Sequence, residues 1–261
     1  MKQKSKDIVI TTALRTAIGK YKGIWKKYQA HDLGKDVIKK ILNNSKVEPN
    51  FIDEIIMGQV LTTNTGQNPA RQAAIKAGIP KEKTGYVINQ VCGSGLRAVA
   101  LAAQHVQLGD ASIVCAGGQE NMSLSPHVAH LRSGYKMGDV KYIDSMIRDG
   151  LWDAFNGYHM GQTAENVAEK WQISRDMQDE FALSSQNKAE AAQIAGKFED
   201  EIVPFTVSTR KGDITVDKDE YIRHGATIEN MQKLRPAFAK DGSVTAANAS
   251  GTVSYTHLTL P

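Results

Sequence analysis

The stretch that decides the fold is residues 85–98, GYVINQVCGSGLRA. Its first seven residues, Gly85 to Val91, are rich in β-branched and aromatic side chains and predict a strand. The glycines at 93 and 95 predict a turn. The run from Gly95 to Leu108, closed by Gly109, predicts a helix that ends on a glycine. Strand, turn and helix in this order are typical of an α/β protein.

The same alternation continues on the amino-terminal side of this stretch and beyond it. Three further strands are predicted, at residues 8–12, 52–60 and 111–116. Apolar side chains spaced for one helical face predict a helix over 31–43, and Pro69 fits the first position of a short helix that ends at Gly78. The sequence therefore predicts a layered αβα fold around a mostly parallel sheet.

The pattern changes after Gly117 and Gly118. From residue 121 onward the chain is more polar, with two predicted helices, over 162–171 and 175–195. A β-hairpin is predicted from 202–208 and 213–216, with its turn near Lys211 and Gly212. We interpret this region as a long insertion over the mouth of the sheet, where substrate contacts tend to concentrate.

Cys92 is the sharpest candidate for chemistry, because it lies where the predicted strand turns into the helix. A helix N-terminus offers a positive dipole end and unpaired backbone N–H groups, and both favour a thiolate, which is the nucleophilic form. Flanking glycines let an acyl group approach the backbone. The alternative is a buried structural cysteine, which is our interpretation of Cys115 in the middle of the strand at 111–116.

A dinucleotide site is a rival interpretation of the same residues. Residues 93–98, GSGLRA, match the pattern G-x-G-x-x-A after a strand, and Glu120 follows about twenty residues later. The match is short, it falls on the third predicted strand, and the thiol of Cys92 would crowd a pyrophosphate.

Two other segments could bind a ligand. Residues 150–161, GLWDAFNGYHMG, place His159 among aromatic, glycine and methionine residues, which suits a pocket for an acyl group; packing within a surface loop is the equal alternative. Residues 234–238, LRPAF, are followed by 243–251, SVTAANASG, whose small residues would let a ligand lie against a strand, although small residues also suit tight core packing.

Composition excludes several classes. The 261 residues carry a net charge of +4 without a basic run, which gives nucleic-acid binding little support. No apolar stretch approaches the roughly 20 residues that span a bilayer. Two cysteines are too few for a disulfide framework and fit a reducing cytosol.

Four motifs in their order resemble the thiolases: residues 91–95 (VCGSG), 117–123 (GGQENMS), 234–238 and 247–251 (ANASG). The resemblance covers residues 6–251. It implies that Cys92 is acylated by an acyl-CoA, with coenzyme A thioesters as substrates, no cofactor and no metal. It also implies a nucleophile-bearing half over 1–120, a coenzyme A-binding loop domain over 121–246 and a return strand at 247–251.

The resemblance further assigns the residues that would line the path of the substrate: Leu151, His159, Met160, Arg223, Phe238, Ala246 and Ser250. The pair His159-Met160 is similar to the short-chain, biosynthetic branch, whose members join two acetyl-CoA molecules into acetoacetyl-CoA. The family implies a homo-oligomer, a homotetramer in this branch, in the cytoplasm. A 3-ketoacyl-CoA thiolase of broader chain length and a non-catalytic acyl-CoA or lipid carrier stay open as alternatives.

Residues 252–261 resemble no thiolase segment and are interpreted as a foreign tail. The family continues into a second half that would supply an activating histidine, a second cysteine and a water-positioning asparagine. No motif in these 261 residues matches those groups. We therefore expect the sequence to be a truncated fragment that is inactive alone.

Overall fold

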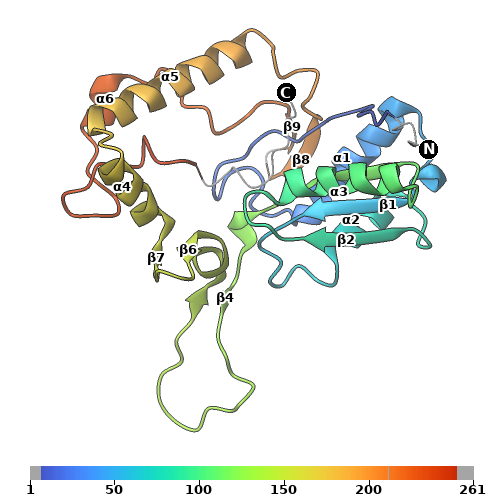
Figure 1. The fold of residues 1–261 in the computed structure, drawn as a ribbon, viewed down its shortest axis with the longest axis horizontal. Coiled ribbons are helices and arrows are strands. Elements are labelled where there is room, and N and C mark those ends of the chain that lie inside the picture. Colours follow the sequence, from blue (N-terminus) through green and yellow to red (C-terminus); the bar gives the residue numbers. More distant parts are fainter. Residues whose placement is uncertain (1–6, 211, 252–261) are drawn as a thin grey trace, which may run out of the picture. The chain divides into compact units, whose positions relative to one another are not determined.

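The computed structural model describes residues 7–210 and 212–251. Within them the chain forms two compact units (Figure 1). Unit 1 holds residues 7–126 and the described part of 200–218; unit 2 holds 127–199 and 219–251. The tail predicted at 252–261 lies outside the described residues.

Unit 1 is built on a three-stranded parallel sheet. The strands are β1 (Glu54–Gly58), β2 (Thr84–Ile88) and β3 (Val114–Gly118), in the order β2-β1-β3. The helices are α1 (Ala30–Ser45), α2 (Pro69–Ala77) and α3 (Ser94–Leu108), and two 3₁₀ turns are η1 (Pro49–Phe51) and η2 (Met122–Leu124). These elements confirm three of the four predicted strands and all three predicted helices of this half, with shifted ends.

The core of unit 1 lies on both faces of the sheet, because side chains of a strand alternate between its faces. Ile55 and Met57 of β1 pack with α1 and α2, whereas Ile56 packs with Ala98 and Ala102 of α3. The result is three layers, helix on sheet on helix. The predicted layered αβα arrangement is confirmed.

The strand predicted at residues 8–12 is wrong. These residues form no ladder, and Val9 and Ile10 are exposed. A cavity of about 670 Å³ is lined by the segment 7–21, by α1 and α3, and by the outer edge of β3. An apolar, β-branched segment forms a strand only where a neighbouring strand supplies hydrogen-bond partners, and here that segment is not paired to β3.

The hairpin β8 (Phe205–Thr209) and β9 (Gly212–Val216) is antiparallel, as predicted. Lys211, predicted in its turn, lies outside the described residues. Phe205 packs edge-on against Trp25 and Tyr28, with 5.1 Å between ring centroids in both pairs. The hairpin therefore belongs to unit 1, whereas the sequence places it in the loop domain over 121–246. Residues 247–251, expected to return to the first half, group with unit 2.

Unit 2 contains the two predicted helices, α4 (Met160–Lys170) and α5 (Arg175–Ile194), and a short α6 (Ile228–Gln232). Two small antiparallel pairs precede them, made of β4 (His127–Val128), β5 (Ile143–Asp144), β6 (Trp152–Asp153) and β7 (Tyr158–His159). One π-helical turn, η3 (Ile147–Leu151), separates the pairs. In the described part of the chain, no helix is long and apolar enough to cross a membrane.

Candidate active site

Cys92 is exposed in a tight turn between the end of β2 and the start of α3. Val91, the residue before it, has φ 49°, a left-handed conformation that is a genuine outlier for a β-branched side chain. The sequence predicts that glycines make this turn, and the structure corrects that prediction. Gly93 has an ordinary φ of −83°, and the left-handed conformation falls on Val91. Such strain costs on the order of 1–3 kcal/mol and clusters at functional sites.

Side chains on either side hold the turn in this conformation. The hydroxyl of Ser94 donates to the carbonyl of Val91 at 2.6 Å and accepts from the N–H of Gln90 at 2.8 Å. The side-chain oxygen of Asn89 accepts from the N–H of Val91 at 2.9 Å. Ser94 is buried, whereas the bond between Asn89 and Val91 lies at the surface. The bonds of Ser94 and Asn89 therefore help to hold the turn that carries Cys92.

The start of α3 lies directly against Gly58, the last residue of β1. A Cβ atom on Gly58 would come within 2.5 Å of the backbone nitrogen of Gly95. Only glycine at position 58 lets the N-terminus of α3 and its positive dipole end lie against the end of β1. The sequence interpretation did not single out Gly58, because a lone glycine at a strand end carries no signal of what approaches it.

Cys115 provides the contrast within the same unit. It lies in β3 among the apolar residues packed by α1 and α2, and burial raises the pKa of its thiol to about 11. The prediction that Cys115 fills the core is confirmed.

The structure argues against the dinucleotide interpretation. The carboxylate of Glu120 is buried and accepts hydrogen bonds from the N–H of Val60 at 2.8 Å and of Leu61 at 3.2 Å. Burial raises the pKa of Glu120 to about 7, even though these N–H groups oppose the rise. A carboxylate committed to the backbone in this way is not presented to a ribose hydroxyl.

In unit 2 the structure brings together His159 and Phe238, which lie almost eighty residues apart. Their rings stack with 5.0 Å between centroids and an interplanar angle of 20°. The Nδ1 atom of His159 also accepts from the N–H of Gly161 at 3.0 Å and so caps the N-terminus of α4. A Cβ on Gly161 would lie 2.2 Å from the ring of Phe238, so glycine makes room for that ring.

A second pair of predicted residues meets at Arg223 and Ala246. The guanidinium of Arg223 donates to the carbonyl of Ala246 at 3.1 Å, and its backbone N–H donates to the side chain of Gln186 on α5 at 2.9 Å. Leu151, half-buried at the end of η3, Met160 at the start of α4 and the exposed Ser250 belong to neither pair.

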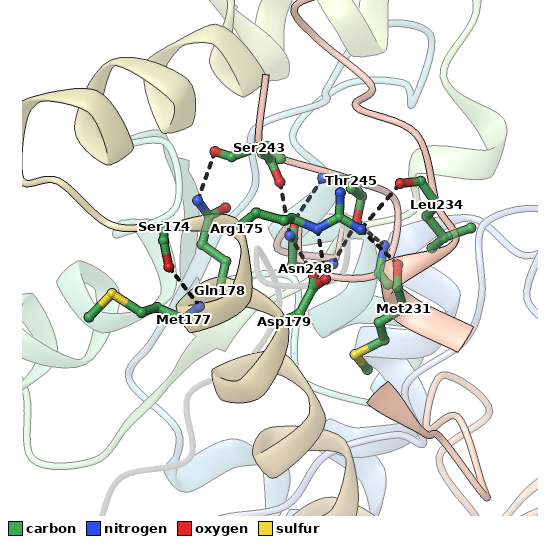
Figure 2. Close-up of polar contacts among 12 residues, drawn as sticks. Ser174, Arg175, Met177, Gln178, Asp179, Met231, Leu234, Ser243, Thr245 and Asn248 are labelled. Atoms are coloured by element: carbon green, nitrogen blue, oxygen red, sulfur yellow. Dashed lines mark hydrogen bonds and ion pairs between the residues drawn. The ribbon is translucent and has the colours of Figure 1, made fainter. Parts of the chain in front are cut away.

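Several residues that shape unit 2 were missed by sequence reasoning. Glu165 of α4 is buried and accepts from the N–H groups of Ser243 and Val244, each at 2.9 Å. Burial raises the pKa of Glu165, but these bonds outweigh that effect and leave the pKa below its ordinary value. Arg175 and Asp179 of α5 form an ion pair at 2.7 Å (Figure 2). Their i, i+4 spacing is the one signal that the sequence offered.

The fold and the site define a class of protein: a layered α/β protein with an exposed cysteine in the turn that leads from a strand into the N-terminus of a helix. The chain belongs to the thiolase N-terminal domain family, whose model, "Thiolase, N-terminal domain", matches residues 8–253.

Named relatives agree with this assignment. The chain is 64% identical over 245 residues to an acetyl-CoA acetyltransferase of Rhizobium meliloti (strain 1021), covering 94% of this chain and 62% of the relative. It is 55% identical over 249 residues to the cytosolic acetyl-CoA acetyltransferase of Rattus norvegicus, covering 95% of this chain and 63% of the relative. The crystal structure of the Bacillus anthracis acetyl-CoA acetyltransferase superposes with a TM-score of 0.89 at 40% identity, covering 93% of this chain and 62% of that one. The chain thus spans somewhat less than two thirds of the length of these relatives.

Proposed function

We propose that this chain serves a thiolase-type acyltransferase that makes or cleaves acetoacetyl-CoA, in the reaction 2 acetyl-CoA = CoA + acetoacetyl-CoA. The observation that carries the proposal is the exposed Cys92, held at the N-terminus of α3 in a chain of the thiolase family. The names of the relatives support the acetyl group as the one transferred.

In the proposed reaction the Cys92 thiolate attacks the thioester carbonyl of acetyl-CoA. A carbon–sulfur bond to Cys92 forms, the bond to coenzyme A breaks, and coenzyme A leaves as a thiolate that takes up a proton. The deprotonated methyl carbon of a second acetyl-CoA then attacks the acetyl-Cys92 carbonyl, which releases Cys92 and gives acetoacetyl-CoA. A base must remove the proton from the methyl group of the second acetyl-CoA. We expect this base in the part of the relatives that this chain does not span.

Coenzyme A binding is proposed for unit 2, through Leu151, His159, Met160, Arg223, Phe238, Ala246 and Ser250. The two contacts His159–Phe238 and Arg223–Ala246 support this, because each joins residues from separate segments into one surface. Coenzyme A thioesters are then substrates and no resident cofactor is needed. A homo-oligomer in the cytoplasm is part of the proposal, and the cytosolic relative in Rattus norvegicus supports the compartment.

The test uses a chimera in which residues 1–251 replace the matching part of the Rhizobium meliloti relative. After mixing with acetyl-CoA, mass spectrometry should find an acetyl adduct on Cys92, and acetoacetyl-CoA should form. Cys92→Ser should abolish both, whereas Cys115→Ser should leave the adduct. Absence of the adduct would argue for a carrier, and equal use of longer 3-ketoacyl-CoA substrates would favour the thiolase of broader chain length.

A further inference from the structure

The segment Leu234–Asn248 of unit 2 carries two of the proposed coenzyme A contacts, Phe238 and Ala246. It contains little regular structure, and a backbone hydrogen bond from the N–H of Ala237 to the carbonyl of Val244 at 2.9 Å joins its two arms. Charged side chains of α5 also hold it (Figure 2), and so does Glu165 of α4. Their contacts fix the two ends of the segment that carries Phe238 and Ala246.

Asp179 is the centre of this arrangement. Its side chain is fully buried, and a buried carboxylate is tolerated only when it is paired and hydrogen-bonded. One carboxylate oxygen accepts from Nε of Arg175 at 2.7 Å, and the other accepts from the side-chain amide of Asn248 at 2.8 Å. Asp179 thus joins helix α5 to the end of the segment, and its burial excludes contact with a bound ligand.

Arg175 holds the beginning of the same segment. Its Nη2 atom donates to the carbonyl of Met231 at 2.7 Å and to the carbonyl of Leu234 at 3.2 Å. Because its Nε donates to Asp179, one guanidinium connects α5 to the residues that lead into Phe238. Ser174 caps α5 one residue earlier by accepting from the N–H of Met177 at 3.2 Å, which fixes the turn of helix that carries Arg175.

Asn248 closes the turn that presents Ala246. Its side-chain oxygen accepts from the N–H of Thr245 at 2.6 Å, and its amide nitrogen donates to the carbonyl of Ser243 at 3.1 Å as well as to Asp179. The carboxylate on one side and the N–H on the other allow a single orientation of the amide. Ala246 remains exposed at the middle of this turn.

We propose that Arg175, Asp179 and Asn248 are positioning residues for coenzyme A. They fix the turn Ser243–Asn248 and thereby set the affinity of unit 2 for coenzyme A without contacting it. This inference rests on the proposed function of unit 2. Glu165 strengthens the same turn from α4, through its bonds to Ser243 and Val244.

The test exchanges the side chains of Asp179 and Asn248, whose carboxylate oxygen and amide nitrogen lie 2.8 Å apart. Asn248→Asp places two carboxylates against each other, and Asp179→Asn puts an amide donor against Arg175 or against Asn248. Each single change should weaken the binding of coenzyme A roughly tenfold or more, since each leaves a charged or buried group unpaired. The double variant, Asp179→Asn with Asn248→Asp, restores the donor and acceptor pairing to Arg175 and to Thr245 but not the bond to the carbonyl of Ser243, so it should recover part of the affinity.

The measurement is calorimetric titration of the 261-residue chain with coenzyme A. Asp176→Asn, an exposed carboxylate on the same helix, is the matched control and should bind as the unchanged chain does. In the chimera the single variants should raise KM for acetyl-CoA and leave kcat nearly unchanged. If Asp179→Asn does not fold, Asn248→Ala, on the half-buried turn, takes its place.

The outcomes separate this inference from the proposed function. Single variants that bind coenzyme A as the unchanged chain does, or a double variant no better than the singles, would overturn the positioning role. If the unchanged chain binds no coenzyme A, the proposed function fails for this chain, and amide hydrogen exchange at Thr245, Ala247 and Asn248 decides the inference. The positioning role is supported if exchange is faster in the single variants and the double variant reverses the change. Unchanged exchange in the single variants refutes the positioning role.

Discussion

At the scale of the residue, the site depends on conformations that ordinary side chains avoid. Val91 takes a left-handed φ beside Cys92, and its neighbours Asn89 and Ser94 supply the hydrogen bonds that keep it there. A turn stabilised by its neighbours can leave the thiol of Cys92 exposed and still hold it in one place. The two cysteines of the chain therefore differ in accessibility and in environment.

We expect Cys92 to react with iodoacetamide at least about a hundredfold faster than Cys115 near neutral pH, since only the exposed thiol lies at a helix N-terminus. Burial raises the pKa of Cys115 to about 11, so its thiolate is scarce as well as covered. Peptide mass spectrometry at timed intervals gives both rates. In denaturant the two rates should converge, whereas equal rates in the folded chain would contradict the prediction.

Glu120 should make the stability of unit 1 depend on pH. Burial raises its pKa from 4.5 to about 7, so between these values the folded chain keeps a proton that the unfolded chain has released. The contribution of Glu120 to the free energy of unfolding is therefore fully present below the pKa that this group has in the unfolded chain. It is lost as the pH rises through about 7.

Urea unfolding measures the free energy of unfolding. Between about pH 5 and about pH 8 it should fall by on the order of 3 kcal/mol more in the unchanged chain than in Glu120→Gln. Glu82→Gln, at an exposed position of the same unit, is the control and should follow the unchanged chain. Parallel pH profiles of the unchanged chain and Glu120→Gln would show that Glu120 does not titrate in this range.

At the scale of the element, the residue that caps the N-terminus of helix α4 makes two kinds of contact. His159 caps the helix through Nδ1 and also stacks on Phe238. The sequence left a pocket role and loop packing as equal alternatives for His159. The structure shows that the ring of His159 packs on Phe238 within unit 2 and is half-buried.

Two substitutions separate the roles of His159. Asparagine keeps a capping acceptor and removes the ring, whereas alanine removes both. In the chimera, both should lower kcat/KM for acetyl-CoA, and both lose the stacking on Phe238. His159→Ala should lower the stability of unit 2 by about 1 kcal/mol more than His159→Asn, since only alanine also removes the cap. Unchanged kcat/KM in His159→Asn would leave His159 as a helix cap and refute its role in binding.

At the scale of the whole molecule, unit 1 keeps large apolar side chains in contact with water. Leu96 and Leu108 of α3 are 57% and 76% exposed, and Val9 is 72% exposed. Residues 96–103 of α3 carry Arg97 as their one charged side chain, and the structure buries one face of the helix against the sheet through Ala98 and Ala102. Burying one leucine side chain is worth roughly 1.5–3 kcal/mol, so these positions favour association.

We expect the 261-residue chain to associate as its concentration rises, with a sedimentation coefficient that increases accordingly. The double variant Leu96→Gln/Leu108→Gln should reduce this association, since it removes the most exposed leucines of α3. Val167→Gln, at an exposed apolar position of α4 in unit 2, is the matched control. A chain that sediments as one monomeric species at every concentration would contradict the expectation.

The sequence alone determined those features that rest on local chemistry. Periodicity and glycine signals gave α1, α2 and α3, Pro69 and Gly78 marked the two ends of α2, and the family motif identified Cys92. The contrast between an exposed Cys92 and a core Cys115 also followed from local pattern, because one lies at a turn and the other inside an apolar strand.

Tertiary structure decided the rest, because the partners lie far apart along the chain. The segment 8–12 has the composition of a strand, yet a strand exists only where another strand pairs with it. The hairpin joined unit 1 because Phe205 packs on Trp25 and Tyr28, contacts that no local pattern encodes. In the same way Asp179 became the anchor of the turn Ser243–Asn248 only when folding placed Asn248 at 2.8 Å from its carboxylate, almost seventy residues away in sequence. Burial of that charge requires a partner, and only the fold determines which residue the partner is.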